Sequence, residues 1–178
     1  MMADVKWDAI LKEGQRSNPA VFHTKIDMPD EIIIPTDFDL MQAFGVEKFG
    51  SAKRLKTWGR KEENGKVVLT DDPHWIAVRN GTPLHVDPKY PRYSHQLKIR
   101  VDPGTFVRGL DKQELELTRG VFYILDTHSP HQVFLKHKHD AWNVSISIDS
   151  HRMWEPQEAL QACIEWGKRA DFITGELR

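Results

Sequence analysis

A histidine and an aspartate two residues apart are the sharpest chemical signal in this sequence. They are His85 and Asp87, in the segment Thr82-Pro-Leu-His-Val-Asp-Pro88. In an extended strand, side chains two positions apart point to the same face, so the imidazole and the carboxylate would lie side by side. Together they could occupy two adjacent corners of an octahedral metal site. The competing interpretation is a polar strand end that runs into an Asp-Pro turn.

A third ligand is expected from a histidine further along the chain. Residues 120–134 read as an apolar strand, a polar turn and a histidine that opens another apolar strand. His131 stands at that opening and is the preferred candidate. His128 is the alternative, but it lies inside a Thr-His-Ser-Pro turn, where a solvated or turn-bonding role is expected. With His85 and Asp87, His131 would complete the catalytic two-histidine, one-carboxylate triad of non-haem Fe(II) oxygenases, which leaves coordination positions for O2 and a co-substrate.

Other chemistries find less support in the sequence. The one cysteine, Cys163, excludes an internal disulfide and a cysteine-built zinc site, and its place on a helical apolar stripe indicates core packing. There is no Gly-x-Ser-x-Gly elbow for a serine hydrolase and no glycine-rich phosphate loop before a helix. The remaining histidines lack a partner pattern and are predicted to be surface, capping or hairpin-tip residues: His23, His74, His137, His139 and His151.

The elements that must position these ligands are mostly short strands separated by turn signals. Strands are predicted over 31–35, 66–69, 75–78, 83–86, 95–101, 105–107, 120–125, 132–135 and 142–148, with a hairpin turn at Asn64-Gly65. Helices are predicted over 4–13, over 36–44 with Thr36 or Asp37 as cap, and over 155–170 with Pro156 in the first turn. This pattern predicts one domain over residues 1–178, mainly β with flanking helices, built as a barrel or jelly roll.

The alternation within the predicted strands also names a core. The residues expected to be mostly buried are Leu84, Val86, Leu97, Ile99, Phe122, Ile124, Val133, Val144, Ile146 and Ile148.

Charge and hydropathy give no general support for a nucleic-acid or membrane partner. The formal net charge of −1 provides no bulk field for nucleic acid or an anionic membrane. No apolar run approaches the roughly 18–20 residues of a membrane helix, and the first residues lack an apolar signal core, so a cytoplasmic protein is expected. A basic stretch around Trp58, residues 53–61, keeps a nucleic-acid contact open as an alternative. A solvated loop balanced by Glu62 and Glu63 is the favoured interpretation.

From His85 to Asp149 the sequence resembles the aspartyl/asparaginyl β-hydroxylase-like branch of the Fe(II)/2-oxoglutarate-dependent dioxygenases. The matching motifs cover a bit more than a third of the chain, in order: His85-Val-Asp-Pro, Arg92-Tyr-Ser-His95-Gln-Leu, Gly120-Val-Phe-Tyr-Ile-Leu-Asp126, His131-Gln-Val and Val144-Ser-Ile-Ser-Ile-Asp149. The resemblance implies a double-stranded β-helix (jelly roll, cupin-like) with Fe(II) in its mouth. It also implies a hydroxylase that uses O2 and 2-oxoglutarate and releases succinate. The expected substrate is an amino acid, free or in a peptide, or another small polar molecule.

The same resemblance places His95 beside the co-substrate. If His95 faces inward, then Leu97, Ile99 and Val101 do so too, and Lys98 and Arg100 face out.

One position departs from the family pattern. These enzymes commonly carry an arginine on the strand after the distal histidine, where it binds the far carboxylate of 2-oxoglutarate, but this sequence has Asn143 there. Ser145 and Ser147 share its face, so Asn143 and Ser145 are predicted to line the co-substrate site. A basic side chain is then expected from elsewhere, with Arg92 first and Arg79, Arg100 and Arg108 as alternatives. Two other functions stay open: a metal-binding or ligand-binding β-barrel without catalysis, and a nucleic-acid oxygenase.

Overall fold

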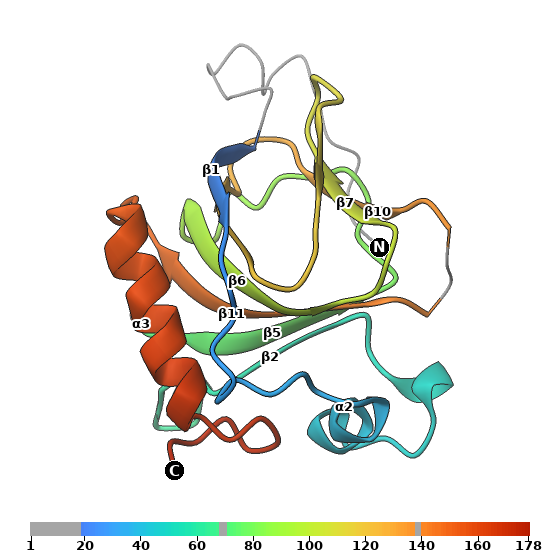
Figure 1. Cartoon of the computed structure of the whole chain (residues 1–178), viewed down its shortest axis with the longest axis vertical. Coiled ribbons are helices and arrows are strands. Elements are labelled where there is room, and N and C mark those ends of the chain that lie inside the picture. Colours follow the sequence, from blue (N-terminus) through green and yellow to red (C-terminus); the bar gives the residue numbers. More distant parts are fainter. Residues whose placement is uncertain (1–18, 68–70, 138–139) are drawn as a thin grey trace.

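Two antiparallel β-sheets that face one another form the body of the protein (Figure 1). The structure is a computed structural model and describes residues 19–67, 71–137 and 140–178. The predicted helix over 4–13 and the end of the predicted strand 66–69 lie outside the described residues. Within the described residues no ladder joins the two sheets into a closed barrel. The prediction of a mainly β fold with flanking helices is confirmed.

The larger sheet has six strands in the order β1-β9-β6-β11-β5-β2, and each neighbouring pair is antiparallel. Its strands are β1 (Ala20–Lys25), β2 (Leu55–Trp58), β5 (His74–Arg79), β6 (Tyr93–Val101), β9 (Val121–Asp126) and β11 (Trp142–Ser150). The smaller sheet has the order β10-β7-β8, with β7 (Thr105–Arg108), β8 (Glu114–Glu116) and β10 (Gln132–Leu135). A separate hairpin of β3 (Glu62–Glu63) and β4 (Lys66–Val67) turns at Asn64-Gly65 as predicted.

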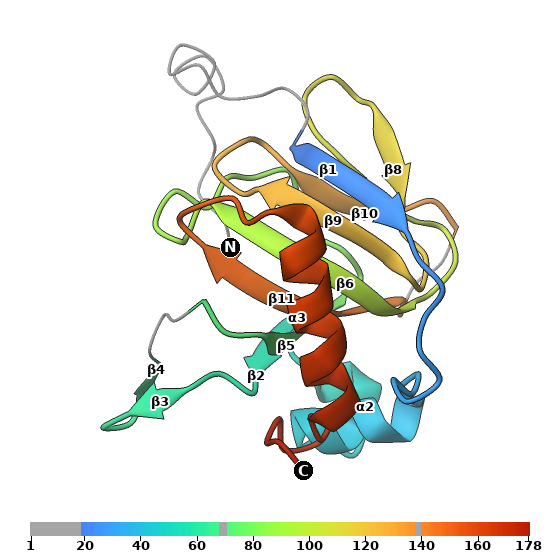
Figure 2. The same cartoon turned by 60° about the vertical axis from the view of Figure 1, so that its left-hand side comes forward.

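Two α-helices cover the outer face of the larger sheet, α2 (Asp37–Phe44) and α3 (Pro156–Arg169) (Figure 2). Thr36 caps α2 through a capping box with Asp39, and Pro156 opens α3, as the sequence predicts. α3 approaches the sheet closely at Gly167, where an added Cβ would lie 2.5 Å from the Ile146 side chain.

Alternate residues of β6, β9 and β11 pack under these helices and form the outer core. They include Leu97, Ile99, Phe122, Ile124, Val144, Ile146 and Ile148, all fully buried, and they pack with the buried Leu160 and Cys163 of α3. These seven predicted core residues are confirmed, and so is the core position of Cys163.

The opposite, inner face of the larger sheet faces the smaller sheet, and unlike the apolar outer face it carries both apolar and polar side chains. On β9 it is apolar: Tyr123 and Leu125 pack against Val107 and Val133, which confirms Val133 as a core residue. On β6 and β11 it is polar, although the side chains are almost inaccessible to solvent. We call this set the inner polar cluster: Ser94, Gln96 and Lys98 of β6 with Ser145 and Ser147 of β11.

Two strand predictions are wrong. Residues 31–35 form a turn and an irregular segment, in which Ile32 enters the outer core while Ile33 and Ile34 are exposed. Residues 83–86 form only a single β-bridge, at His85, so Leu84 and Val86 are half-buried rather than buried. Neither segment gains a continuous hydrogen-bonded neighbour, which a strand requires.

Four strands of the described residues were not predicted. These are β1 and β2, which form the two edges of the larger sheet, the three-residue strand β8 and the two-residue strand β3. Among the described residues, no helix has the length and apolarity needed to cross a membrane.

Candidate metal site

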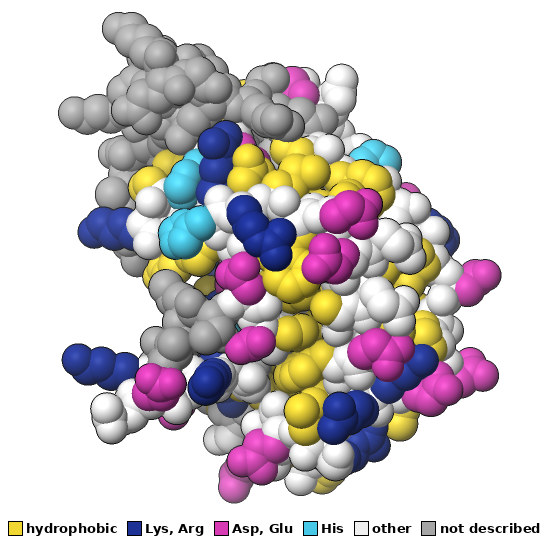
Figure 3. All heavy atoms as spheres, turned by 90° about the vertical axis from the view of Figure 1, so that its left-hand side faces the viewer, with side chains coloured by type: hydrophobic (Ala, Val, Ile, Leu, Met, Phe, Trp, Pro, Cys, Tyr) yellow, Lys and Arg dark blue, Asp and Glu magenta, His cyan; other side chains and the backbone are white. Residues whose placement is uncertain are grey.

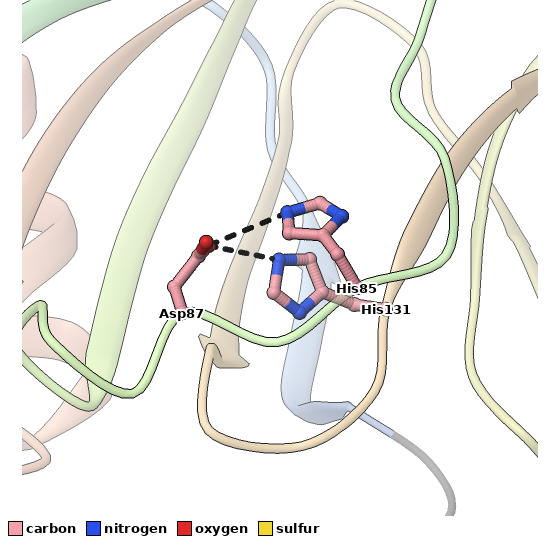
Figure 4. A group of neighbouring side chains, drawn as sticks. All are labelled: His85, Asp87 and His131. Atoms are coloured by element: carbon pink, nitrogen blue, oxygen red, sulfur yellow. Dashed lines mark ion pairs between the residues drawn. The ribbon is translucent and has the colours of Figure 1, made fainter. Parts of the chain in front are cut away.

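The side chains of His85, Asp87 and His131 converge at one end of the space between the sheets (Figure 4). The Nε2 atoms of His85 and His131 lie 3.4 Å and 3.3 Å from the same carboxylate oxygen of Asp87. The two imidazole rings are tilted by 55° with centroids 4.2 Å apart. Both histidines are buried, whereas the Asp87 side chain is 31% exposed, so the group opens toward solvent on the aspartate side.

Backbone pairing sets the two histidines opposite one another. His85 and His131 form a two-way antiparallel bridge, with N–H to carbonyl distances of 3.0 Å and 2.9 Å. The backbone N–H of Asp87 donates to the carbonyl of Thr127 at 2.9 Å, which ties Asp87 to the turn that precedes His131. The predicted strand 83–86 is therefore absent, but one bridge and one hydrogen bond still bring the three side chains together.

A close backbone approach at Gly81 makes this pairing feasible. Gly81 has a φ of +70°, and an added Cβ would lie 2.3 Å from the carbonyl oxygen of Val133. Directly after it, the Thr82 N–H donates to that same carbonyl at 2.8 Å, and Thr82 Oγ1 accepts the Val133 N–H. The segment that carries His85 can thus lie against β10 only because residue 81 has no side chain.

The tautomer of both histidines is fixed by backbone carbonyls. His85 Nδ1 lies 2.6 Å from the carbonyl of Pro83, and His131 Nδ1 lies 2.9 Å from the carbonyl of Ser129. A carbonyl can only accept, so each Nδ1 carries a proton. Each Nε2 points at Asp87 and is the atom left to bind a metal, which would displace any proton that Nε2 carries in the metal-free protein. Such outer hydrogen bonds orient histidine ligands and raise their basicity in metal sites.

The spacing of the three donor atoms fits a first-row divalent metal. Two ligand atoms at adjacent octahedral corners, each about 2.1 Å from the metal, are separated by about 3 Å. The measured separations of 3.3 Å and 3.4 Å are close to this, and all three donor atoms lie within 4.8 Å of one another. Two imidazoles and one carboxylate, with room for further ligands, are the donor set of non-haem Fe(II) sites, so the residues fit Fe(II).

The two imidazoles stabilise the negative charge of the Asp87 carboxylate. Burial opposes ionisation of Asp87, but hydrogen bonds from His131 and His85 hold the pKa of the Asp87 carboxyl well below its usual value. Burial likewise lowers the pKa of His85, but its hydrogen bonds to Asp87 and Pro83 prevail and raise it above the usual value. The aspartate is therefore an anion at neutral pH, as a metal ligand must be.

His128, the alternative third ligand, has a different role. Its Nε2 lies 2.9 Å from the carbonyl of Tyr90, and its backbone N–H donates to Asp126. It joins no group of metal-binding side chains among the described residues. The structure thus brings His131, not His128, to His85 and Asp87.

His95 lies away from the inner polar cluster. It shares the outer face of β6 with Leu97 and Ile99, and its side chain is fully buried. Its Nδ1 lies 2.8 Å from the carbonyl of Ile148 and its Nε2 accepts the Trp154 N–H at 3.0 Å. Both ring nitrogens are therefore satisfied in the neutral form, and burial lowers the pKa of His95. Its position points to a structural role at the start of α3.

The predicted outward position of Lys98 is wrong. Lys98 belongs to the face opposite His95 and is 1% exposed. Its ammonium donates to Gln96 Oε1 at 2.8 Å and to Ser145 Oγ at 2.9 Å, and it lies 4.8 Å from the ring centroid of Tyr123. Burial lowers the pKa of Lys98 to about 7. Among the described residues, no carboxylate forms an ion pair with it and no acceptor meets its third N–H.

The four arginines considered as anion anchors are engaged elsewhere. Arg92 forms a fork on Asp126, and Arg100 binds Asp37 and Asp102. Arg79 pairs with Asp140, and Arg108 stacks on Phe134. Lys98 is a buried basic residue that the sequence analysis did not consider as an anion anchor. Parity places it on the face of Ser94 and Gln96, opposite His95, but does not show which of the two faces is the inner one.

Asn143 and Ser145 lie on the inner face, as their alternation predicts. Ser145 belongs to the inner polar cluster through Lys98. Asn143 is 5% exposed, and its Oδ1 is buried without a hydrogen-bond donor among the described residues. An unpaired buried carbonyl oxygen is unusual in a native protein and often marks a place where a bound molecule supplies the missing partner.

The basic stretch 53–61 does not offer a stacking platform. Trp58 is 8% exposed and packs against Trp75 and Phe172. The Lys56 ammonium donates to the carbonyl of Ala43, and Arg60 pairs with Asp149. The face that carries α3 shows acidic and basic side chains side by side (Figure 3). Trp58 is therefore too buried to stack on a base, and Arg60 already has an acidic partner.

Comparison with known proteins adds no assignment. No protein-family model matches the chain, and a search of curated proteins gave no match.

Proposed function

We propose that this protein is an Fe(II)- and 2-oxoglutarate-dependent dioxygenase that hydroxylates a small polar substrate or an amino acid, free or in a peptide. The observation that carries the proposal is the convergence of His85, Asp87 and His131 with both Nε2 atoms directed at the Asp87 carboxylate. The two facing sheets would then be the halves of a double-stranded β-helix, with the metal at its open end.

The residues of the triad would hold Fe(II) and leave adjacent positions for a bidentate 2-oxo acid and O2. Fe(II) bound there would supply the redox chemistry: 2-oxoglutarate, O2 and substrate C–H give succinate, CO2 and substrate C–OH. One atom of O2 enters succinate and the other enters the hydroxyl group. Asp87 contributes one negative charge, and the Nδ1 hydrogen bonds of the two histidines keep the ligand nitrogens in place.

Lys98 supports the proposal at the far end of the co-substrate. A buried ammonium without a counter-ion is costly, and an anionic ligand would compensate it. The charges also balance: two positive from Fe(II), one negative from Asp87, two negative from 2-oxoglutarate and one positive from Lys98 cancel. Ser145 can orient the ammonium, and the orphan Oδ1 of Asn143 lies on the same inner face.

The decisive experiment is an anaerobic titration of the Fe(II)-loaded protein with 2-oxoglutarate. The chelate of Fe(II) with a 2-oxo acid gives a weak visible charge-transfer band, and we expect this band for wild type and its loss in His131→Ala. His128→Ala is the matched control, because that histidine lies outside the triad, and it should retain the band.

The competing functions give different results in the same assay. A metal-binding protein without catalysis would bind Fe(II) but show no band and release no succinate under air. Wild type with neither band nor succinate would refute the dioxygenase proposal even if iron binds. A band lost in His128→Ala but kept in His131→Ala would refute the assignment of the third ligand.

A further inference from the structure

Asp126 is a buried carboxylate at the junction of the two segments that carry the metal ligands. It ends β9 and is 0% exposed. The turn that follows it leads to His131, and its partner Arg92 stands five residues after Asp87, just before β6. The proposed chemistry gives neither Asp126 nor Arg92 a role.

The Asp126 carboxylate binds Arg92 through a fork of hydrogen bonds. Arg92 Nε donates to Oδ1 and Oδ2 at 3.2 Å each, and Nη2 donates to Oδ2 at 3.0 Å. Oδ1 also accepts the backbone N–H of His128 at 3.1 Å. One carboxylate therefore ties the start of β6 to the turn after β9, and a planar guanidinium is the group best suited to such a fork.

A short chain of hydrogen bonds leads from this pair to Asp87. The Thr127 N–H donates to the carbonyl of Arg92 at 2.7 Å, and Thr127 Oγ1 donates to the carbonyl of Pro91 at 3.1 Å. The carbonyl of Thr127 in turn accepts the Asp87 N–H at 2.9 Å. The backbone at Asp87 is thus held by the residue directly after Asp126.

A second chain leads from Asp126 to His131. The carbonyl of Asp126 accepts the Ser129 N–H at 3.0 Å. The carbonyl of Ser129 accepts the Nδ1–H of His131 at 2.9 Å, which fixes the ring and its tautomer. Movement of Asp126 would therefore displace two of the three proposed metal ligands at once.

We propose that Asp126 and Arg92 form a positioning pair that sets the relative placement of Asp87 and His131 and so determines the metal affinity. The inference rests on the proposed metal site, but it does not depend on 2-oxoglutarate or on hydroxylation. It assigns Arg92 to the support of the metal ligands, in place of the co-substrate contact expected from the sequence.

The test is titration of the full-length, metal-free protein with Co(II) alone, followed by the visible d–d absorption of the bound ion. Arg92→Lys keeps the positive charge but loses the fork, and Asp126→Asn keeps the size but loses the charge. Each variant should bind Co(II) about 10- to 100-fold more weakly than wild type, with an altered absorption spectrum. The Arg92 side chain is 42% exposed, so Arg92→Lys remains a usable test if Asp126→Asn does not fold.

Arg100→Lys is the matched control. Arg100 also stands on β6 and forms ion pairs with Asp37 and Asp102, but at the other end of the strand. It should bind Co(II) with wild-type affinity and spectrum, whatever its melting temperature. If Arg92→Lys melts lower yet binds Co(II) as wild type does, the pair is only structural and the inference is refuted. If wild type binds no Co(II), the metal site itself fails, and the inference with it.

Discussion

The Lys98 ammonium lies 2.8 Å from the amide oxygen of Gln96, so a neutral group faces the one lysine or arginine that is buried among the described residues. The Gln96 amide is held in this orientation from both sides: its Nε2 donates to Ser94 Oγ at 2.9 Å, and its Oε1 also accepts the Tyr123 hydroxyl at 3.2 Å. An amide orients the ammonium without neutralising it. The positive charge is thus available to an anion from outside the chain, whose negative charge would favour the ammonium form against the burial that lowers the pKa of Lys98 to about 7.

Gln96→Glu should therefore destroy the anion site while preserving the fold. The new carboxylate is nearly isosteric with the amide and would pair directly with Lys98, which removes the charge that a dicarboxylate needs. We expect the affinity of the Fe(II)-loaded variant for 2-oxoglutarate to fall at least about tenfold, since a charge-assisted contact contributes roughly 1.5–3 kcal/mol. Anaerobic titration measures this, with metal affinity as the internal control. An unchanged affinity would remove Lys98 from the co-substrate site.

Lys98→Met should separate stability from binding. The methionine has a similar length and no charge to bury, and Gln96 Oε1 keeps the Tyr123 hydroxyl as a donor. We expect the ligand-free variant to be more stable than wild type by about 1–3 kcal/mol, because an uncompensated buried charge is lost. Binding of 2-oxoglutarate should be lost. Urea unfolding and the same titration measure the two effects, and a strongly destabilised variant would show that the ammonium is an essential part of the fold.

The sequence was sufficient to find the three side chains that converge at the candidate metal site, because their signal is local. His85 and Asp87 are two residues apart, and His131 opens a strand, so no knowledge of the sheet order was needed. Long, strongly alternating strands such as β6 and β11 were predicted for the same reason, and so was α3 with its proline start. The edge strands β1 and β2 were missed because their pairing with β9 and β5 depends on contacts distant in the sequence.

The inner polar cluster could not be assigned from the sequence alone. Alternation shows that His95 and Lys98 lie on opposite faces of β6, but it does not show which face is turned toward the second sheet. Both faces of this strand are buried, because α3 covers one and the smaller sheet faces the other. The usual rule that a lysine marks the solvent side therefore fails at Lys98.

Gly81→Ala should damage the metal site through the backbone. The alanine Cβ would meet the carbonyl oxygen of Val133 at 2.3 Å, and the positive φ adds strain. The segment carrying His85 would have to move away from β10, so we expect a loss of about 2 kcal/mol or more in stability and a weaker affinity for Co(II). Gly65→Ala is the control, since Gly65 also has a positive φ but its added Cβ meets nothing within 4 Å. Equal metal affinity in the two variants would contradict the role of Gly81.

The buried His74 should make the protein less stable as the solution becomes acidic. His74 is 3% exposed, and its Nε2 accepts a hydrogen bond from Arg60 at 2.9 Å, which requires the neutral ring. Burial lowers the pKa of His74 to about 4, although the nearby Asp149 partly opposes this. In the unfolded chain the pKa returns to its usual value of about 6.5. The unfolded state therefore binds more protons between these two values, so the free energy of unfolding is unaffected above about pH 6.5 and falls as the pH drops toward about 4.

His74→Gln removes this titration and leaves an amide oxygen that can still accept from Arg60. Over the whole interval the His74 contribution corresponds to roughly 3 kcal/mol, so the variant should lose that much less stability than wild type on acidification. Urea unfolding at about pH 7 and about pH 5 measures most of the difference. His85, whose raised pKa stabilises the fold at lower pH, contributes equally to both proteins, so its effect cancels when the stability loss of the variant is subtracted from that of wild type. His23→Gln on the exposed side of β1 is the control and should follow wild type. If His74→Gln loses as much stability between the two pH values as wild type does, the buried imidazole is not the group that sets the acid sensitivity.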